Sequence, residues 1–210
     1  ATTVDSSEPT ILLVEDNKRV RDYLKELLSN QYHLHLAHNG KKGLEIANTK
    51  KIDFIISDVM MPIMDGFEFC KQIKNQVETS HLPFIMITAK VEINDKLKGY
   101  QLGVDAYLNK PFNNQELLAI IENLIKKREQ QINYYSKLLK LPDNTTNYNQ
   151  LDIDFINKLQ QIALNKDLKL SADDISKKLF TSRTQLHRKI KVLTGMSITE
   201  YFNQIRVEKA

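Results

Sequence analysis

The chain has 210 residues, 41% of them hydrophobic and 27% charged, which is an ordinary globular composition with enough apolar residues for a sizeable core. This composition excludes a wholly disordered chain. The single cysteine, Cys70, excludes a disulfide framework and a cysteine-ligated zinc site, and its place in an apolar helical pattern predicts a buried position. The lack of a disulfide framework predicts a reducing, cytoplasmic location. No run of about 20 apolar residues is present, so we predict no membrane contact by this segment.

The formal net charge of +4 is unevenly distributed along the chain. Residues 1–130 contain 17 basic and 18 acidic side chains, whereas residues 131–210 contain 13 basic and 8 acidic ones. The segment 175–199 has six basic residues and no acidic one. A near-neutral N-terminal part followed by a basic C-terminal part indicates a control domain joined to a nucleic-acid-binding domain. A solvated lysine-rich surface would give the same pattern.

The first 130 residues alternate between short apolar runs and segments with helical spacing of apolar residues. The apolar runs predict five strands, at residues 11–14, 33–36, 54–56, 84–87 and 106–108. Strands that alternate with helices favour a parallel sheet covered by helices on both faces. We therefore predict a doubly wound α/β fold of five parallel strands, the flavodoxin-like arrangement.

A long connecting helix is predicted from near Asn113 to about Leu139, because no Gly or Pro interrupts the chain before Pro142. Its apolar residues form an incomplete heptad pattern, which fits either a self-associating helix or a simple extension. The polar, turn-rich segment 142–150 is predicted to be a linker.

Beyond this linker the apolar spacing is helical only. Four helices are predicted: about Asp154–Asn165, one that begins after Ser171, one from Ser182 to Gly195, and one from Ser197 onward. The C-terminal part is therefore expected to be an all-α segment.

Polar side chains follow the predicted parallel strands at the points where these strands end. Glu15 and Asp16 follow the first strand and Asp58 follows the third. Thr88 follows the fourth strand and Lys110 follows the fifth. The carboxyl ends of parallel strands meet at one edge of the sheet, where ligands bind in such folds, so these five residues are expected to converge.

Three converging carboxylates repel one another unless a cation lies between them. Oxygen ligands with open positions suit Mg²⁺, which also binds phosphate oxygens. An aspartate beside this ion can act as a nucleophile towards a phosphoryl group, and a lysine and a hydroxyl can hydrogen-bond the phosphoryl oxygens. Polar residues on loops are common for other reasons, but five at matching strand ends favour a phosphoryl-transfer site.

Residues 9–130 resemble the receiver domain of two-component response regulators along almost their whole length. The motifs that carry the resemblance are Ile11–Asn17, Ile56–Pro62 with Met64–Gly66, Ile87–Lys90 and Gly103–Phe112. The resemblance implies that a histidine kinase phosphorylates Asp58. It implies a Mg²⁺ site formed by Glu15, Asp16, Asp58 and the carbonyl group of Met60.

The same resemblance implies that Lys110 and Thr88 stabilise the phosphoryl group, and that Thr88 and Tyr107 form the switch that reports it. Phosphorylation is then expected to favour a homodimer. A phosphatase of the haloacid-dehalogenase type carries a second aspartate two residues after the nucleophile, but Met60 occupies that position here. We therefore predict no small-molecule substrate.

Residues 171–195 are predicted to form a helix-turn-helix with its turn at Phe180 and Thr181. Apolar residues on its two helices are expected to pack together, which leaves basic and polar residues to face a DNA groove. The candidate DNA contacts are Arg183, Thr184, Gln185, His187, Arg188 and Lys191.

Residues 170–176 and 182–195 look like the first helix-turn-helix of an AraC-type DNA-binding domain, and 197–206 is similar to the start of its linker helix. A complete domain of this type has a second helix-turn-helix, so residues 151–210 correspond to its first part. The order of segments is similar to the C-terminal end of hybrid two-component regulators, whose parent chains are membrane-anchored.

The predicted organisation has four parts: a linker remnant at 1–8, a receiver at 9–128, a connecting helix and linker at 129–150, and a partial AraC-type domain at 151–210. The predicted function is a response regulator of a hybrid two-component system that controls transcription. The receiver is not expected to be a classical enzyme by itself. The alternative is a phosphorelay or protein-docking module whose C-terminal helices bind protein and not DNA.

Overall fold

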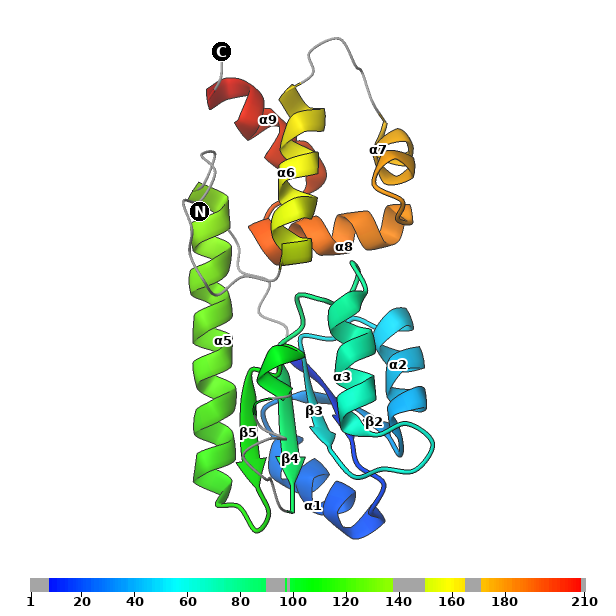
Figure 1. Ribbon diagram of the computed structural model, residues 1–210. Coiled ribbons are helices and arrows are strands. Elements are labelled where there is room, and N and C mark those ends of the chain that lie inside the picture. The colour runs from blue at the N-terminus through cyan, green and yellow to red at the C-terminus, as the bar shows by residue number, and fades with distance from the viewer. Residues whose placement is uncertain (1–7, 90–96, 98, 138–149, 165–170, 209–210) are drawn as a thin grey trace. The chain divides into compact units, whose positions relative to one another are not determined.

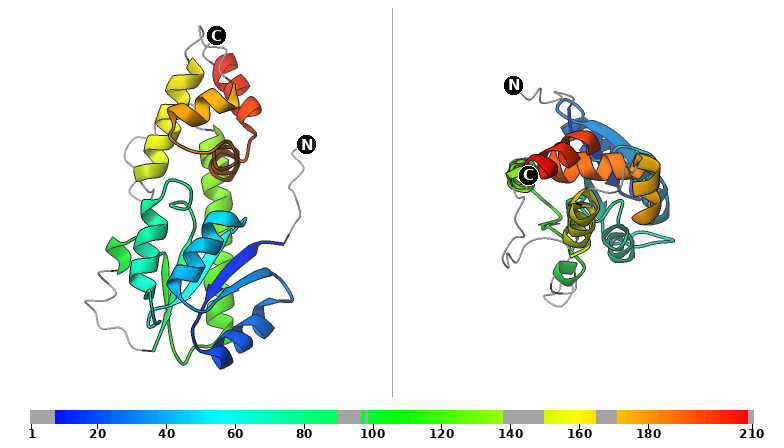
Figure 2. Two further views of the ribbon diagram at one scale, coloured as in Figure 1. Left: turned by 90° about the vertical axis from the view of Figure 1, so that its right-hand side faces the viewer. Right: turned by 90° about the horizontal axis from the view of Figure 1, so that it is seen from above.

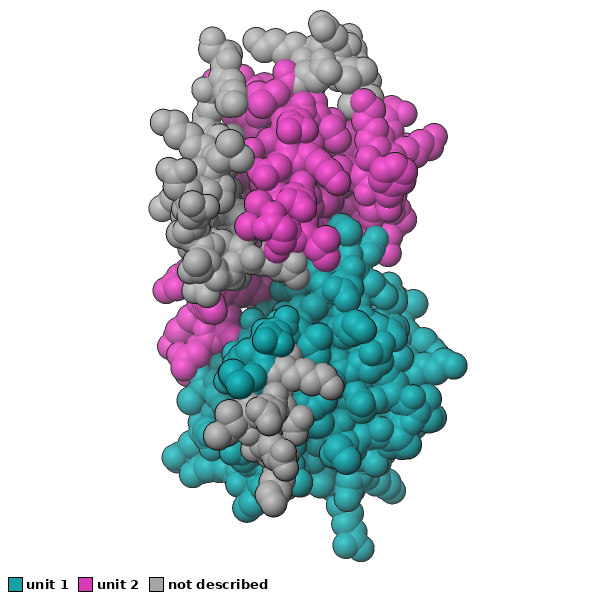
Figure 3. All heavy atoms as spheres, viewed as in Figure 1, with its two compact units in different colours: residues 1–121 teal, residues 122–210 magenta. Residues whose placement is uncertain are grey.

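The computed structural model describes residues 8–89, 97, 99–137, 150–164 and 171–208. The chain divides into two compact units, residues 1–121 and residues 122–210 (Figure 3). We call them the receiver unit and the helical unit. Most of the predicted segments 1–8 and 142–150 lies outside the described residues.

The receiver unit is built on one five-stranded sheet, shown with its helices in Figure 1. Its strands are β1 Thr10–Val14, β2 His33–Ala37, β3 Phe54–Asp58, β4 Phe84–Thr88 and β5 Ala106–Asn109. All neighbours pair in parallel, in the order β2-β1-β3-β4-β5. The predicted strands and the predicted parallel α/β sheet are therefore confirmed, with shifts of one or two residues at the strand ends.

Helices cover both faces of this sheet (Figures 1 and 2). They are α1 Lys18–Leu28, α2 Gly40–Thr49, α3 Gly66–Asn75 and α5 Asn114–Lys137. Helices α2 and α3 contribute to one apolar core with alternate residues of β1, β3 and β4, and Cys70 is buried in this core as predicted. Leu24 and Leu28 of α1 and Leu117 and Ile121 of α5 are also buried.

The sheet order places β1 beside β3, so the loops that follow these two strands are neighbours. The strand order reverses between β1 and β3, and ligands of open α/β sheets bind at this point. The predicted connecting helix corresponds to α5, which runs without interruption to Lys137. Alternation of strands and helices predicts a further helix between β4 and β5, but most of this segment lies outside the described residues.

The helical unit includes α6 Gln150–Leu164, α7 Ala172–Lys178, α8 Arg183–Thr194 and α9 Ile198–Glu208. Ser171 and Ser182 form capping boxes at the starts of α7 and α8, and Gly195 ends α8 in the left-handed conformation with φ 74°. These helix starts and this helix end match the predictions from sequence. Phe155, Leu159, Ile190, Tyr201 and Ile205 are buried within the unit.

Helices α7 and α8 form the predicted helical pair. Ile175 of α7 and Leu186, Ile190 and Leu193 of α8 are buried, while Leu179 is partly buried. Among the described residues, no helix has both the length and the apolar character needed to cross a membrane.

Candidate phosphoryl-transfer site

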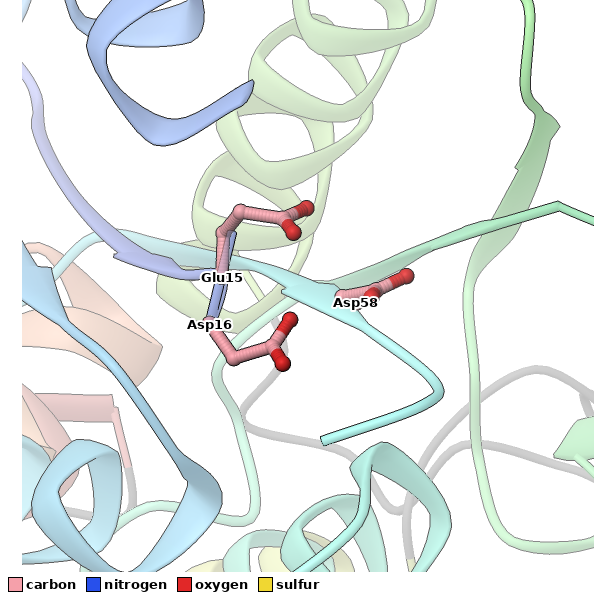
Figure 4. Close-up of side chains that lie close together, drawn as sticks. All are labelled: Glu15, Asp16 and Asp58. Carbon is pink, nitrogen blue, oxygen red and sulfur yellow. The ribbon is translucent and has the colours of Figure 1, made fainter. Parts of the chain in front are cut away.

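The three predicted carboxylates lie together at the ends of β1 and β3 (Figure 4). Glu15 and Asp16 directly follow β1, and Asp58 is the last residue of β3. One carboxylate oxygen of each residue lies within 4.8 Å of the other two. We call Glu15, Asp16 and Asp58 the acidic rim. It is the one such group of three or more potential metal-ligating side chains among the residues that the structure describes.

Lys110 reaches into the acidic rim from the end of β5. Its Nζ atom lies 2.7 Å from Oε2 of Glu15 and 3.1 Å from Oδ1 of Asp58. Burial alone would lower the pKa of Lys110, but the hydrogen bond and the charges of the two carboxylates outweigh burial and raise it. Lys110 is therefore held in its charged form and neutralises part of the negative charge.

Burial also changes the acidity of the two inner carboxyl groups. The pKa values of Glu15 and Asp58 are raised, and the main cause for each is burial, which disfavours the charged carboxylate. Lys110 opposes this effect at both groups. The side chain of Asp16 is exposed to solvent. The site therefore combines two buried carboxylates with one that faces solvent.

The loop that carries Glu15 and Asp16 is fixed by two side chains that follow it. Asn17 caps α1 by accepting a hydrogen bond from the backbone N–H of Arg19. The Arg21 guanidinium donates to the backbone carbonyl of Glu15 at 2.6 Å and to that of Asp16 at 3.2 Å. Helical spacing does not distinguish Arg21 from Arg19, so this role of Arg21 was not predicted from the sequence.

The loop after β3 begins and ends beside Asp58. The backbone N–H of Gly66 donates to the carbonyl of Val59 at 2.9 Å. A Cβ atom at Gly66 would lie 2.3 Å from the carbonyl oxygen of Asp58, so the close approach of this loop requires glycine. The side chain of Met60, whose carbonyl is the predicted fourth ligand, is 75% exposed.

The two predicted switch residues lie on neighbouring strands. Thr88 is the buried last residue of β4, and its backbone carbonyl accepts a hydrogen bond of 2.7 Å from the N–H of Lys110. Tyr107 of β5 is partly buried and packs edge-to-face with Tyr100, with ring centroids 5.2 Å apart. A Cβ atom at Gly99 would lie 1.3 Å from the Tyr107 hydroxyl, so this position of the tyrosine depends on glycine.

The residues of the acidic rim fit a divalent cation. Hard ions such as Mg²⁺ bind carboxylate oxygens, and a cation between these three side chains would offset their mutual repulsion and their cost of burial. In this geometry Asp58 presents a carboxylate nucleophile next to a cation site and to a lysine that can bind phosphoryl oxygens.

The candidate DNA contacts on α8 differ in exposure. Arg183, Thr184 and Lys191 are exposed, and Gln185, His187 and Arg188 are partly buried. Gln185 accepts a hydrogen bond from the backbone N–H of Ser182 and so helps to cap α8. Arg183 and Thr184 at the start of α8, together with Lys191, are the most accessible members of the predicted set.

One lysine of the basic segment is not on the surface. Lys189 is 2% exposed, and its Nζ atom lies 2.7 Å from Oδ1 of Asp152 on α6. The same atom lies 5.1 Å from the centre of the Phe155 ring. Lys189 therefore contributes to the core of the helical unit and not to a basic surface.

The amino-acid sequence of residues 11–122 matches the response regulator receiver domain family. The chain belongs to this family. It is similar along 98% of its length to "Histidine kinase P4" of Formosa agariphila, with 33% identity over 208 residues that cover 15% of that protein.

Other relatives match a smaller part of the chain. "Probable transcriptional regulator ycf29" of Porphyra purpurea is 38% identical over 116 residues, which are 55% of this chain and 56% of that protein. "Hybrid signal transduction histidine kinase D" of Dictyostelium discoideum is 37% identical over 59% of this chain and 8% of its own length. The chain thus spans between about a twelfth and just over half of the length of these relatives.

A solved receiver domain shows a related fold with a metal ion. The receiver domain of a sensor histidine kinase from Pseudomonas aeruginosa PAO1, with a magnesium ion coordinated in its active site cleft, matches with a TM-score of 0.54 and 30% identity. The match covers 57% of this chain and 99% of that domain. The five-stranded sheet and the acidic rim thus belong to a receiver of a two-component response regulator.

Proposed function

We propose that this chain accepts a phosphoryl group on Asp58 from a histidine kinase and controls transcription through its helical unit. The observation that carries the proposal is the acidic rim, with Lys110 bound between Glu15 and Asp58. The kinase could belong to the same parent protein, because relatives include a histidine kinase and a hybrid kinase. A cytoplasmic location follows from this partner.

In the proposed reaction, a carboxylate oxygen of Asp58 attacks the phosphorus atom of a phosphohistidine. The bond between phosphorus and the imidazole nitrogen breaks, and an acyl phosphate forms on Asp58. Glu15, Asp16, Asp58 and the Met60 carbonyl would hold Mg²⁺, which supplies positive charge for the transferring phosphoryl oxygens. Lys110 then exchanges its carboxylate partners for phosphoryl oxygens, and the Thr88 hydroxyl donates to the same group.

The proposed output depends on Thr88 and Tyr107. Movement of these residues towards the phosphoryl group would change the surface formed by β5 and its neighbouring helices, and so favour a homodimer. A dimer places two helix-turn-helix pairs on adjacent DNA half-sites. Light scattering with beryllofluoride and Mg²⁺ tests this step: the account predicts a doubled mass for the unmodified chain and an unchanged mass for Asp58→Asn.

Phosphoryl transfer is tested with a small phosphodonor such as acetyl phosphate. Intact-mass spectrometry should show one added phosphoryl group in the presence of Mg²⁺ and none in excess EDTA. Asp58→Asn should abolish this addition. Asp65→Asn, which changes the exposed cap of α3, is the matched control and should retain it. Labelling of Asp58→Asn at the unmodified rate would refute the proposal.

DNA binding through α8 is supported by its exposed Arg183 and Lys191. Binding that weakens steeply with salt is expected, because basic side chains displace counterions from DNA. Lys191→Ala should weaken binding, whereas Lys158→Ala removes the same charge from the exposed face of α6 and should not. If Lys191→Ala binds DNA as tightly as Lys158→Ala does, the second candidate is favoured. This candidate is a phosphorelay or docking module whose helices bind protein.

A further inference from the structure

The loop Met60–Asp65 presents an unusual residue next to the phosphoacceptor. Ile63 has a φ of 72°, and the only other non-glycine residue with positive φ among those described is Phe180. A β-branched side chain is especially unfavourable in this left-handed region, because its Cβ substituents crowd the backbone. Glycine or asparagine would fit this backbone with less strain.

Backbone hydrogen bonds fix Ile63 in this conformation. The N–H of Met64 donates to the carbonyl of Pro62 at 2.8 Å, and the carbonyl of Met64 accepts from the N–H of Gly40 at 3.1 Å. The loop is therefore anchored to α2 on one side and, through Gly66, to the end of β3 on the other. Because these contacts involve the backbone, they do not require an isoleucine side chain.

The Ile63 side chain also packs very little against the core. It is 79% exposed, and the neighbouring Met60 is 75% exposed, which makes them the two most exposed large apolar side chains of the described receiver unit. Burial of apolar surface stabilises a fold only where water is excluded. Neither backbone strain nor burial therefore accounts for an isoleucine at this position.

The short distance between Ile63 and Asp58 indicates which kind of partner covers the Ile63 side chain. Ile63 precedes Gly66 by three residues in the sequence, so the Cα atoms of these two residues are at most about 11 Å apart. The Gly66 backbone itself contacts the Asp58 carbonyl. A protein interface of about 800 Å² per partner, centred on Asp58, extends roughly 15 Å from its centre. A protein that delivers a phosphoryl group to Asp58 therefore covers the loop.

We propose that Ile63, with Met60, is an apolar docking contact for the protein phosphodonor, which presents an apolar strip beside its phosphohistidine. This inference rests on the proposed phosphorylation of Asp58 and adds the surface that recognises the donor. Methionine and other apolar side chains are enriched in the cores of interfaces, where charged residues are depleted. The strained isoleucine thus serves recognition and not folding.

The test compares a protein donor with a small one on the same variant. Ile63→Gly removes the docking side chain and relieves the backbone strain, so its Tm should rise by a few degrees. Labelling by acetyl phosphate with Mg²⁺ should stay within about twofold of the unmodified chain. Transfer from an autophosphorylated histidine kinase that labels the unmodified chain should fall about tenfold, which corresponds to about 1.4 kcal/mol.

Phe180→Gly is the matched control, because it changes the other exposed apolar residue with positive φ, in the helical unit. It should leave transfer from both donors unchanged. Ile63→Asn provides a second docking variant that tolerates the left-handed backbone.

The inference is overturned if both Ile63 variants accept the phosphoryl group from the kinase at the unmodified rate, or if both donors are slowed equally. Failure of the unmodified chain to be labelled by either donor would instead refute the proposed function, and this inference with it.

Discussion

The two units of this protein present their candidate functional residues in opposite ways. In the receiver unit, Glu15, Asp58 and Lys110 are largely buried and contact one another. In the helical unit, Arg183 and Lys191 are exposed, and the buried Lys189 serves the core instead. Burying charge is costly, and the acidic rim gathers three carboxylates against one lysine, an excess that points to a site for a cation, whereas exposed cations on a helix are common.

The largest expected effect concerns a buried ion pair of the helical unit, Lys189 with Asp152, in which both side chains are almost inaccessible. Asp152→Ala removes the carboxylate that pairs with the buried Lys189 amine. We expect the free energy of unfolding of this unit to fall by about 3–5 kcal/mol. Urea denaturation followed by far-UV circular dichroism measures this change.

Asp154→Ala is the control for this experiment, since Asp154 is exposed on the same helix. The double variant Asp152→Leu with Lys189→Met should regain most of the stability, because apolar side chains of similar size often replace a buried ion pair without loss. A cost below about 1 kcal/mol for Asp152→Ala would contradict the assignment of Lys189 to the core.

A smaller effect is expected where Tyr107 packs on Gly99 in the receiver unit. Gly99→Ala places a Cβ atom 1.3 Å from the present position of the tyrosine hydroxyl, so the ring must move. Overpacking of this kind costs about 1–3 kcal/mol of stability. Urea denaturation should show this loss in the unmodified background and almost none with Tyr107→Leu. An equal loss in both backgrounds would mean that Tyr107 does not occupy this position.

At neutral pH the smallest effect concerns Cys70, which lies in the receiver core and takes no part in the site. Burial raises the pKa of its thiol from about 9.0 to about 12. The folded chain therefore keeps this proton when the unfolded chain has lost it, so the contribution of Cys70 to stability falls as pH rises above about 9 and is constant below.

A thiol reagent should accordingly react with the native chain at pH 8 only as fast as the receiver unit opens. Denaturation curves for Cys70→Val should lack the part of the alkaline destabilisation that this thiol causes. Rapid labelling of the native protein would show that Cys70 is accessible.

The sequence predicts the features that depend on local pattern. Apolar runs located all five strands, and Ser182 and Gly195 marked the ends of α8, because capping and the left-handed conformation are local preferences. The acidic rim was also predictable, since parallel strands bring their carboxyl ends to one edge of the sheet.

Contacts set by tertiary packing were not predictable in this way. Lys189 meets Asp152 across 37 residues, and the charge of the basic segment gave no sign that this lysine has a buried partner. Helical spacing did not select Arg21 as the residue that holds the loop of Glu15 and Asp16. The left-handed backbone of Ile63 opposes the preference of isoleucine and is imposed by the loop.

The most direct test of the account is to locate the phosphoryl group on the chain. After reaction with acetyl phosphate and Mg²⁺, reduction with borohydride and peptide mass spectrometry would identify the modified carboxyl group. The account predicts modification at Asp58 alone, with none at Glu15 or Asp16. Modification at another carboxyl group, with Asp58 unchanged, would contradict it.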